Sequence, residues 1–287
     1  LGLLVEEQRT NYIVYSEELD DAGWARNGVG ISTNTTTSPS GEITAEKIFD
    51  APGVSGNQHW LRRRATGLST NSTYTASAYL KFDSTNSNFR HLSLTITDAE
   101  TGGSSYSAVA ISTSGTATVT SSQFTNTSAD ITTLPNGWYR AHLTFTNVGV
   151  TNQLSLRLAL LTNSNGGVYN SDGSSGVFVW GAQLEAGEFP TSYIPTSGST
   201  KTRNADNVTI TGTNFTDFYN QSEGTMIWIG NVYSKELSPV QPFRINRTTG
   251  GNLRGMGIQF DTRSANNTVN FMSRTQSSNI PSKVGPT

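Results

Sequence analysis

Three residues of one predicted strand have the chemistry of a binding surface. In the stretch 59–64, Trp60, Arg62 and Arg64 occupy alternate positions, so a strand places all three side chains on one face. An indole ring packs on the C–H face of a sugar, and guanidinium groups donate paired hydrogen bonds to carboxylates. The same residue types also anchor protein interfaces. We therefore expect this face to bind a glycan or a second subunit, and a plain surface or core role is the third interpretation.

Tyr79 is a further candidate for ligand contact. It alternates with core-type residues in the stretch 72–82 and shares a polar face with Lys81. An aromatic ring beside an ammonium group suits an acidic or neutral glycan, and it suits an interface between subunits equally well. The sequence thus predicts a set of ligand or interface residues that consists of Trp60, Arg62, Arg64 and Tyr79.

Acidic side chains occur in pairs, but their spacing does not predict catalysis. Glycosidases need two carboxylates across a cleft, at a separation of roughly 5 to 10 Å. Glu185 and Glu188 lie at the end of a predicted strand and in the loop beyond it, so we expect them to be structural. Neighbours on a strand point to opposite faces. We therefore expect no enzymatic activity, and a solvated surface role for the pairs Glu6–Glu7, Glu17–Glu18 and Asp20–Asp21.

The residues do not predict a zinc site or an organic cofactor. The chain has no cysteine, and its histidines lie on separate predicted strands, without the spacing of zinc ligands: His59, His91 and His142. Calcium is bound by carbonyl and carboxylate oxygens, which leave little trace in a sequence. A calcium ion on a loop therefore stays open, with Asp83, Asp98 or Asp172 as its carboxylate ligand.

The composition favours a β-protein and excludes several other classes. Only 14% of the 287 residues are charged and the net charge is −2, so the polarity comes mainly from Ser, Thr, Asn and Gly. Typical soluble domains have about 25% charged residues. Because no basic stripe is present, we expect no nucleic acid partner. No run of 18 apolar residues occurs, so we expect no membrane-spanning helix.

Alternating apolar residues define most of the predicted strands, with Gly-, Asn-, Asp- and Ser-rich turns between them. Many short strands with one polar face predict an all-β antiparallel fold, a two-sheet sandwich or a barrel. One short helix is predicted over 16–24, capped by Ser16. The predicted core consists of Trp24; Tyr74, Ala76, Ala78, Leu80 and Phe82; Leu92, Leu94 and Ile96; Tyr139, Ala141, Leu143 and Phe145; Leu154, Leu156, Leu158 and Leu160; and Phe178, Trp180, Ala182 and Leu184.

Prolines mark the end of the first predicted domain. Pro190 and Pro195 prevent continuous strand pairing, and a run of Ser, Gly and Thr follows. We therefore expect a first domain over 1–195, a linker over 196–206 and a second domain over 207–287. Strands of the second domain are expected to start at 207–212 and 223–233. The chain begins with Leu1 and ends without a closing pattern, so we expect the natural protein to continue at both ends.

Several motifs resemble a module of bacteriophage tail, spike and head-fibre proteins. They are GLLVEEQRTNYIVYSEELDDAGW at the start, YTASAYLK and GWYRAHLTFT in the middle, and VFVWGAQLEAGEFPTSYIPT followed by TRNADNVTITG. The module is similar to carbohydrate-binding jelly rolls. The later stretch FTDFYNQSEGTMIWIGNVY resembles the opening of a concanavalin A or laminin G type sandwich. The resemblance implies an antiparallel jelly-roll β-sandwich over 1–195 and the start of a second sandwich over 207–287.

The same resemblance implies a protein of the virion surface. We expect a non-enzymatic tail-fibre, spike or head-fibre protein that forms a homo-oligomer, a trimer by the resemblance. Its partners would be other virion proteins and a host cell-surface glycan. Two alternatives stay open. One is a tail-spike polysaccharide depolymerase whose catalytic part is absent from this chain or forms between subunits, and the other is a purely architectural capsid or tail protein.

Overall fold

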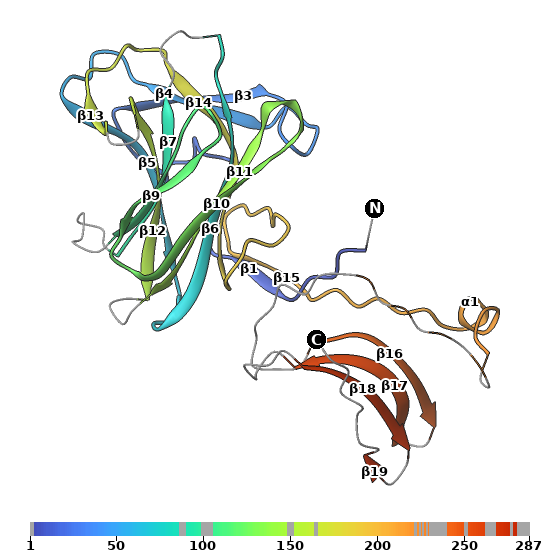
Figure 1. Ribbon diagram of the computed structural model, residues 1–287. Helices are drawn as coiled ribbons and strands as arrows, with labels where there is room; N and C mark the ends of the chain where they lie inside the picture. Colours follow the sequence, from blue (N-terminus) through green and yellow to red (C-terminus); the bar gives the residue numbers. More distant parts are fainter. Residues whose placement is uncertain are drawn as a thin grey trace. The chain divides into compact units, whose positions relative to one another are not determined.

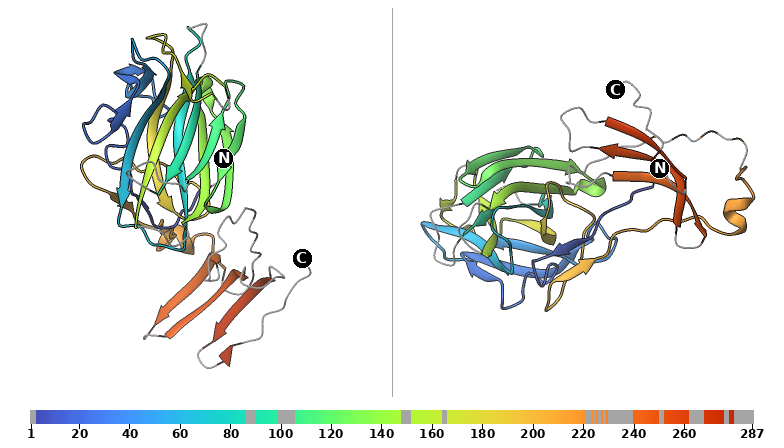
Figure 2. Two further views of the ribbon diagram at one scale, coloured as in Figure 1. Left: turned by 90° about the vertical axis from the view of Figure 1, so that its left-hand side faces the viewer. Right: turned by 90° about the horizontal axis from the view of Figure 1, so that it is seen from below.

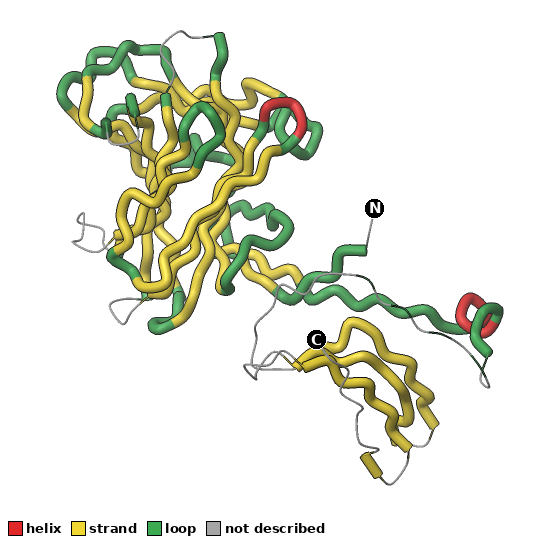
Figure 3. Tube along the Cα trace, viewed as in Figure 1, coloured by secondary structure: helices red, strands yellow, loops and turns green. Residues whose placement is uncertain are grey.

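The computed structural model divides into two compact units, Leu1–Val208 and Thr209–Thr287. It describes residues 3–85, 90–98, 106–147, 152–163 and 166–220, the single residues 223, 225, 227 and 229, and the backbone of four later strands. Strands dominate, and the helices of the described part are the short turns η1 (Pro135–Gly137) and α1 (Thr213–Thr216) (Figure 3). Within that part, no helix is long and apolar enough to cross a membrane.

The first unit is a sandwich of two antiparallel sheets (Figures 1 and 2). One sheet has the strand order β10-β11-β6-β14-β4-β3, and the other has the order β13-β5-β12-β7-β8-β9, with β2 also paired to β5. This arrangement confirms the predicted all-β antiparallel sandwich. In chain order the strands are β2 (Ala25–Asn27), β3 (Val29–Thr36), β4 (Ala45–Asp50), β5 (Asn57–Thr66), β6 (Ser72–Phe82), β7 (His91–Thr97), β8 (Tyr106–Ile111), β9 (Ala117–Ser122), β10 (Thr125–Thr133), β11 (Tyr139–Asn147), β12 (Gln153–Leu161), β13 (Val168–Tyr169) and β14 (Gly176–Ala186).

The core lies between the two sheets and follows the period-two pattern of the sequence. Strands β6 and β11 face strands β7 and β12 across it, and their alternate apolar side chains interdigitate there. The predicted core faces of these four strands are confirmed, with Phe82 and Tyr139 at the margin of the cluster. Trp24 is also buried in the core, as predicted, and its Nε1 donates a hydrogen bond to the carbonyl of Tyr15 at 3.0 Å.

Strand β14 departs from the predicted alternation. The main core takes Val177 and Val179 from its first half and Ala182 and Leu184 from its second half. The pairing with β6 shifts register between Trp180 and Gln183, and Gly181 has a φ of 63°. A bulge of this kind inserts one extra residue into the strand. The core-facing side chains therefore lie at odd-numbered positions before the bulge and at even-numbered positions after it.

The prediction that Phe178, Trp180 and Leu184 share one core face is therefore wrong. Trp180 is buried, but in a second cluster on the opposite face of the sheet, with Trp138 and Ala45. Phe178 packs against that second cluster and is only partly buried.

The two ends of the first unit lie side by side. Strand β1 (Arg9–Asn11) pairs antiparallel with β15 (Lys201–Arg203), and the carboxylate of Asp206 accepts a hydrogen bond from the backbone N–H of Glu6 at 2.8 Å. Figure 1 shows these two strands together at the foot of the sandwich. The expected linker over 196–206 thus contains a strand that the sequence pattern does not predict.

The predicted helix over 16–24 is absent, and a series of turns takes its place. The carbonyl of Ser16 accepts the backbone N–H of Ala182, and Asp21 caps a turn by accepting the N–H of Gly23. Since Trp24 must reach the core, the segment follows tertiary contacts rather than local helix preference.

The second unit contains a four-stranded antiparallel sheet of order β16-β17-β18-β19. Its strands are β16 (Val240–Thr249), β17 (Asn252–Asp261), β18 (Thr268–Thr275) and β19 (Ser278–Asn279). The strand expected at 207–212 is not formed, because Val208 and Ile210 are exposed and carry no ladder partner. Most of the strand expected at 223–233 lies outside the described residues.

Candidate binding sites

Trp60 lies on the outer face of the seven-stranded sheet, the face turned away from the core. It alternates on β5 with the buried His59 and Leu61 and is itself partly exposed. The guanidinium groups of Arg62 and Arg157 each lie 5.3 Å from the centre of its ring. A cation at this distance from an indole is attracted by the ring quadrupole. The structure therefore adds Arg157, which the sequence does not single out, to the predicted pair Trp60 and Arg62.

Strand register explains this gathering of side chains. Trp60 pairs with Ala159 and Arg62 pairs with Arg157 across β5 and β12. Residues directly opposite each other on an antiparallel pair point to the same face, so Arg157 approaches Trp60 diagonally. On the next strands the same rows continue with short side chains, so the large polar groups of this face gather around Trp60: Ser93 and Thr95 on β7, and Ala108 and Ala110 on β8.

Amide side chains hold two of the arginines in place. Gln58 accepts a hydrogen bond from Arg157 Nη2 at 3.0 Å, and Gln153 accepts one from Arg64 Nη1 at 3.3 Å. Arg64 is exposed and lies two residues beyond Arg62 on the same face. Arg62 and Arg157 thus lie over the ring, and Gln58 orients Arg157 before any ligand arrives. Arg64, farther along the strand, is bonded to Gln153.

Tyr79 belongs to the other sheet. It lies on β6, where its ring contacts Trp180 at 5.2 Å and Tyr193 at 6.2 Å, measured between ring centres. Arg140 lies over it at 5.1 Å. Burial raises the pKa of the Tyr79 hydroxyl, and Arg140 partly offsets this. The structure brings Trp60, Arg62 and Arg64 together, whereas Tyr79 is part of the packing beneath Tyr193.

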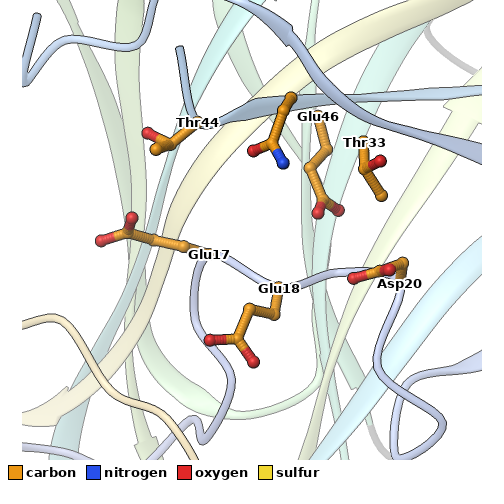
Figure 4. Close-up of a pocket in the computed structure, with 7 residues that line it drawn as sticks. Glu17, Glu18, Asp20, Thr33, Thr44 and Glu46 are labelled. Atoms are coloured by element: carbon orange, nitrogen blue, oxygen red, sulfur yellow. The ribbon is translucent and has the colours of Figure 1, made fainter. Parts of the chain in front are cut away.

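The second candidate site is the acidic pocket, a cavity of about 290 Å³ beside strands β3 and β4. Its lining consists of Glu17, Glu18, Asp20, Thr33, Asn34, Thr44 and Glu46. Figure 4 shows that Glu46 directs its carboxylate toward the segment that carries the other three acids. Four acidic side chains line this cavity, and Asp20 is the acid whose charge acts on Glu46.

Glu46 is the unusual member of the acidic pocket. Its side chain is 3% exposed, and its Oε2 has no hydrogen-bond partner within the part of the chain that the structure describes. Burial, followed by the charge of Asp20, raises the pKa of Glu46 to about 8. Backbone hydrogen bonds from Leu19 and Asp20 and the charge of Arg26 act in the opposite direction.

The sequence pattern does not single out Glu46, and we expected Glu17, Glu18 and Asp20 to be solvated surface residues. A signal was nevertheless present, because Glu46 has the same parity on β4 as the core residue Ile48. The segment 17–20 and β4 line the same cavity although they are distant in the chain. The alternation of residues within one strand does not reveal this proximity.

Two of the three acids considered for calcium, Asp83 and Asp172, have protein partners. Asp83 accepts a hydrogen bond from Lys47 Nζ at 2.6 Å. Burial raises the pKa of Asp83, but hydrogen bonds from Lys47 and Thr85 outweigh burial, so the pKa of Asp83 is lowered overall. Asp172 accepts Arg90 Nη2 at 2.9 Å. Asp98 follows β7, and its Oδ1 is buried with no hydrogen-bond partner among the residues that the structure describes. Among the described residues, no three acidic or histidine side chains are grouped so that they could hold a metal ion.

The first unit also contains a buried charge network that the sequence pattern does not predict. Asp50 is fully buried and accepts hydrogen bonds from Arg90 Nε at 2.9 Å, from Arg90 Nη2 at 2.6 Å and from the Tyr169 hydroxyl at 2.7 Å. The ring of His59 stacks on Tyr169 at 4.0 Å, and burial lowers the pKa of His59. This network ties β4, β5 and β13 together.

Glu185 and Glu188 have the structural character expected of them. Glu185 is fully buried and accepts hydrogen bonds from Gln183 and Thr191, while Glu188 is exposed and accepts Thr144 Oγ1 only through its backbone carbonyl. Their side chains therefore do not face each other across a cleft.

No protein-family model matches the chain, and no curated protein matches it either. Three solved structures show remote likenesses. The enzymatically active domain of bacteriophage CBA120 tailspike protein 4 is 9% identical, with a TM-score of 0.38 over 61% of this chain and 21% of that one. The CBM22-1 xylan-binding domain of Paenibacillus barcinonensis Xyn10C is 10% identical, with a TM-score of 0.36 over 66% of this chain and 100% of that domain.

The third structure is the CBM22-1–GH10 part of Clostridium thermocellum xylanase Xyn10B, complexed with xylohexaose. It is 10% identical, with a TM-score of 0.34 over 67% of this chain and 30% of that one. This chain therefore spans about a fifth of the tailspike domain and under a third of the xylanase. The likenesses are too remote to assign the chain to a family.

Proposed function

We propose that this protein is a non-enzymatic appendage protein of a bacteriophage virion, and that its first unit binds a glycan of the host surface. One observation carries the binding role: Trp60 is partly exposed on the outer face of the sheet, with Arg62 and Arg157 each 5.3 Å from the centre of its ring. We call Trp60, Arg62, Arg64 and Arg157 the Trp60 surface.

The Trp60 surface has the parts that saccharide binding needs. The indole offers an apolar plane for the C–H face of a pyranose ring, and the guanidinium groups donate hydrogen bonds to hydroxyl or carboxylate oxygens. Because Gln58 already orients Arg157, little side-chain entropy is lost on binding. Three arginines favour a saccharide that carries carboxylate or sulfate groups.

The virion role is supported by the sequence motifs at both ends of the first unit. In the proposed assembly the chain forms a homo-oligomer, a trimer, and contacts other virion proteins. The pairing of β1 with β15 brings the entry and the exit of the chain to one place, which is compatible with a module carried by a larger protein. The proposal includes no chemistry on the glycan, in line with the structural role of Glu185.

A glycan array tests this proposal. The chain of 287 residues, fluorescently labelled, is applied to immobilised acidic and neutral bacterial polysaccharides. We expect retention on acidic glycans that the Trp60→Ala variant loses, with intact glycan recovered afterwards. Retention that is equal in both proteins, or a fall in polysaccharide viscosity on incubation, contradicts the proposal.

A further inference from the structure

We propose that the acidic pocket is a second ligand site, which binds the ammonium group of an amino sugar. This goes beyond the proposed function, because the pocket involves no residue of the Trp60 surface and attracts the opposite charge. Its carboxylates come from the segment Glu17–Asp20 and from β4.

The charge of the pocket selects a cation. Four of its seven lining residues are acidic, and Arg26 is the cation whose charge reaches Glu46. The Nη2 of Arg26 donates to the backbone carbonyl of Asp20, and the charge of Arg26 offsets only part of the acidity of the lining. The described acids are not grouped as metal ligands, so the cation that fits is one with a larger body, hydrogen-bonding through several N–H groups.

Glu46 provides the second, independent sign of a ligand. A buried carboxylate oxygen without a donor is costly, and native proteins rarely leave one unsatisfied. Its Oε2 is in that position, and the side chain points into the cavity (Figure 4). An ammonium group placed there would donate to Oε2 and favour the ionised form of Glu46, which burial alone disfavours.

The walls of the acidic pocket are held in place by the fold. On one side, Asp21 forms an ion pair with Arg63 at 3.0 Å, and the buried Trp24 anchors the segment to the core. On the other side, β3 changes register between Ser32 and Thr36, and Asn34 within that irregularity has a φ of 50°. The cavity is therefore formed in advance rather than induced by a ligand.

The neutral part of the lining favours an amino sugar over a lysine side chain. Thr33, Asn34 and Thr44 add two hydroxyls and an amide to the lining beside the acids. A lysine side chain has no hydroxyl group that could form hydrogen bonds with these three residues. A hexosamine has one ammonium group and several hydroxyls, which match both kinds of wall. A cavity of about 290 Å³ is at the small end for ligand sites, which suits a single sugar ring.

Amide NMR of the full chain tests this proposal with four probes. Glucosamine carries the ammonium group, N-acetylglucosamine and glucose lack it, and Nα-acetyl-lysine amide supplies it without hydroxyls. We expect glucosamine at pH 6.5 to shift the amides of 17–20, 33–34 and 44–46, with an affinity at least about tenfold above the three others. Equal shifts from glucose, stronger binding of the lysine derivative, or no shift with glucosamine would each overturn the proposal.

Matched variants identify the pocket as the source of the shifts. Glu46→Gln keeps the shape but cannot ionise to pair with an ammonium group, and Glu17→Gln removes one charge at a partly exposed position of the lining, where Glu17 also interacts with the Tyr193 hydroxyl. Each is expected to weaken glucosamine binding at least about fivefold, whereas Glu42→Gln, an exposed acid outside the pocket, leaves it unchanged. Unaltered binding in both pocket variants contradicts the site.

The two proposals fail separately. Trp60→Ala is expected to leave the glucosamine shifts intact, because Trp60 does not line the pocket. Loss of array binding in Trp60→Ala with normal glucosamine shifts supports two independent sites, and loss of both signals in that variant contradicts them.

Discussion

Thr191 donates its hydroxyl hydrogen bond to Glu185 Oε2 at 2.7 Å, and its backbone N–H to Glu185 Oε1 at 2.9 Å. The same carboxylate accepts Gln183 Nε2 at 2.6 Å, and Arg9 Nε lies 3.8 Å away. The chain after Pro190 is therefore fastened back onto the last core strand through one buried carboxylate. The turn between this strand and the prolines therefore closes the sandwich.

Glu185→Ala should strongly destabilise the first unit. The change leaves Thr191, Gln183 and the buried Arg9 without their shared acceptor, and loss of one partner from a buried charged network typically costs about 3 kcal/mol. Urea unfolding followed by tryptophan fluorescence measures this loss. The control is Glu188→Ala, where an exposed side chain is removed and less than about 0.5 kcal/mol is expected. Similar midpoints for both variants would refute the closure role.

Gly181→Ala tests the bulge in β14. A Cβ at this position would meet the ring of Tyr79 at 3.0 Å, and the φ of 63° disfavours any side chain. Gly53→Ala is a matched control, because its φ is 78° but no atom lies within 4 Å of the added carbon. We expect a cost of about 1 kcal/mol for Gly53→Ala and about 1–2 kcal/mol more for Gly181→Ala. Equal thermal midpoints would show that the contact with Tyr79 is unimportant.

The alternation of β6, β7, β11 and β12 could be predicted because each of these strands presents one uninterrupted face to one core. In β14 the pattern alone was misleading, since a single glycine with positive φ exchanges the two faces. Gly181 was visible in the sequence as a signal of a possible bulge, but the register shift depends on contacts with Ser16 and Tyr79, which are distant in the chain.

In the candidate sites, too, contacts within one strand could be predicted from the sequence, whereas contacts between strands could not. The grouping of Trp60, Arg62 and Arg64 follows from spacing on one strand, and the structure keeps it. Arg157 joins them through the register of β5 and β12, and Tyr79 is separated from them because β6 belongs to the other sheet. Sheet membership and register are set by the whole fold, so a single sequence does not reveal them.

The pH dependence of stability should reveal Glu46. Its pKa of about 8 lies above the ordinary 4.5, so the folded protein holds the proton more tightly than the unfolded chain. The resulting stability is fully present below pH 4.5 and is lost as the pH rises through 8. The charges that face Glu46 are those of Asp20 and Arg26, with Glu17 and Glu18 across the cavity.

Glu46→Gln removes this dependence, since the amide does not ionise. Between pH 5 and pH 9 we expect the wild-type free energy of unfolding to fall by about 2–4 kcal/mol more than that of the variant. Thermal unfolding at matched ionic strength measures the difference, and Glu42→Gln serves as a surface control. Parallel pH profiles for wild type and Glu46→Gln would contradict the burial of an ionisable Glu46.

The network of Asp50 and Arg90 should behave as one unit. Asp50→Ala leaves the buried Arg90 without its main acceptor, at an expected cost of about 3–5 kcal/mol. Because Arg90→Ala removes the same interaction, the double variant should lose clearly less than the sum of the single losses. Additive losses in the urea midpoints would show that the pair is not coupled.

Titration calorimetry of Trp60→Ala tests the central claim most directly. The ligand is the acidic saccharide best retained by the wild-type protein, and Lys201→Ala controls for the loss of one surface charge from an exposed position. The account predicts that Trp60→Ala weakens binding by about 2 kcal/mol or more, that Lys201→Ala binds like wild type, and that the saccharide is recovered uncleaved. Wild-type affinity in Trp60→Ala, or cleavage of the saccharide, would contradict it.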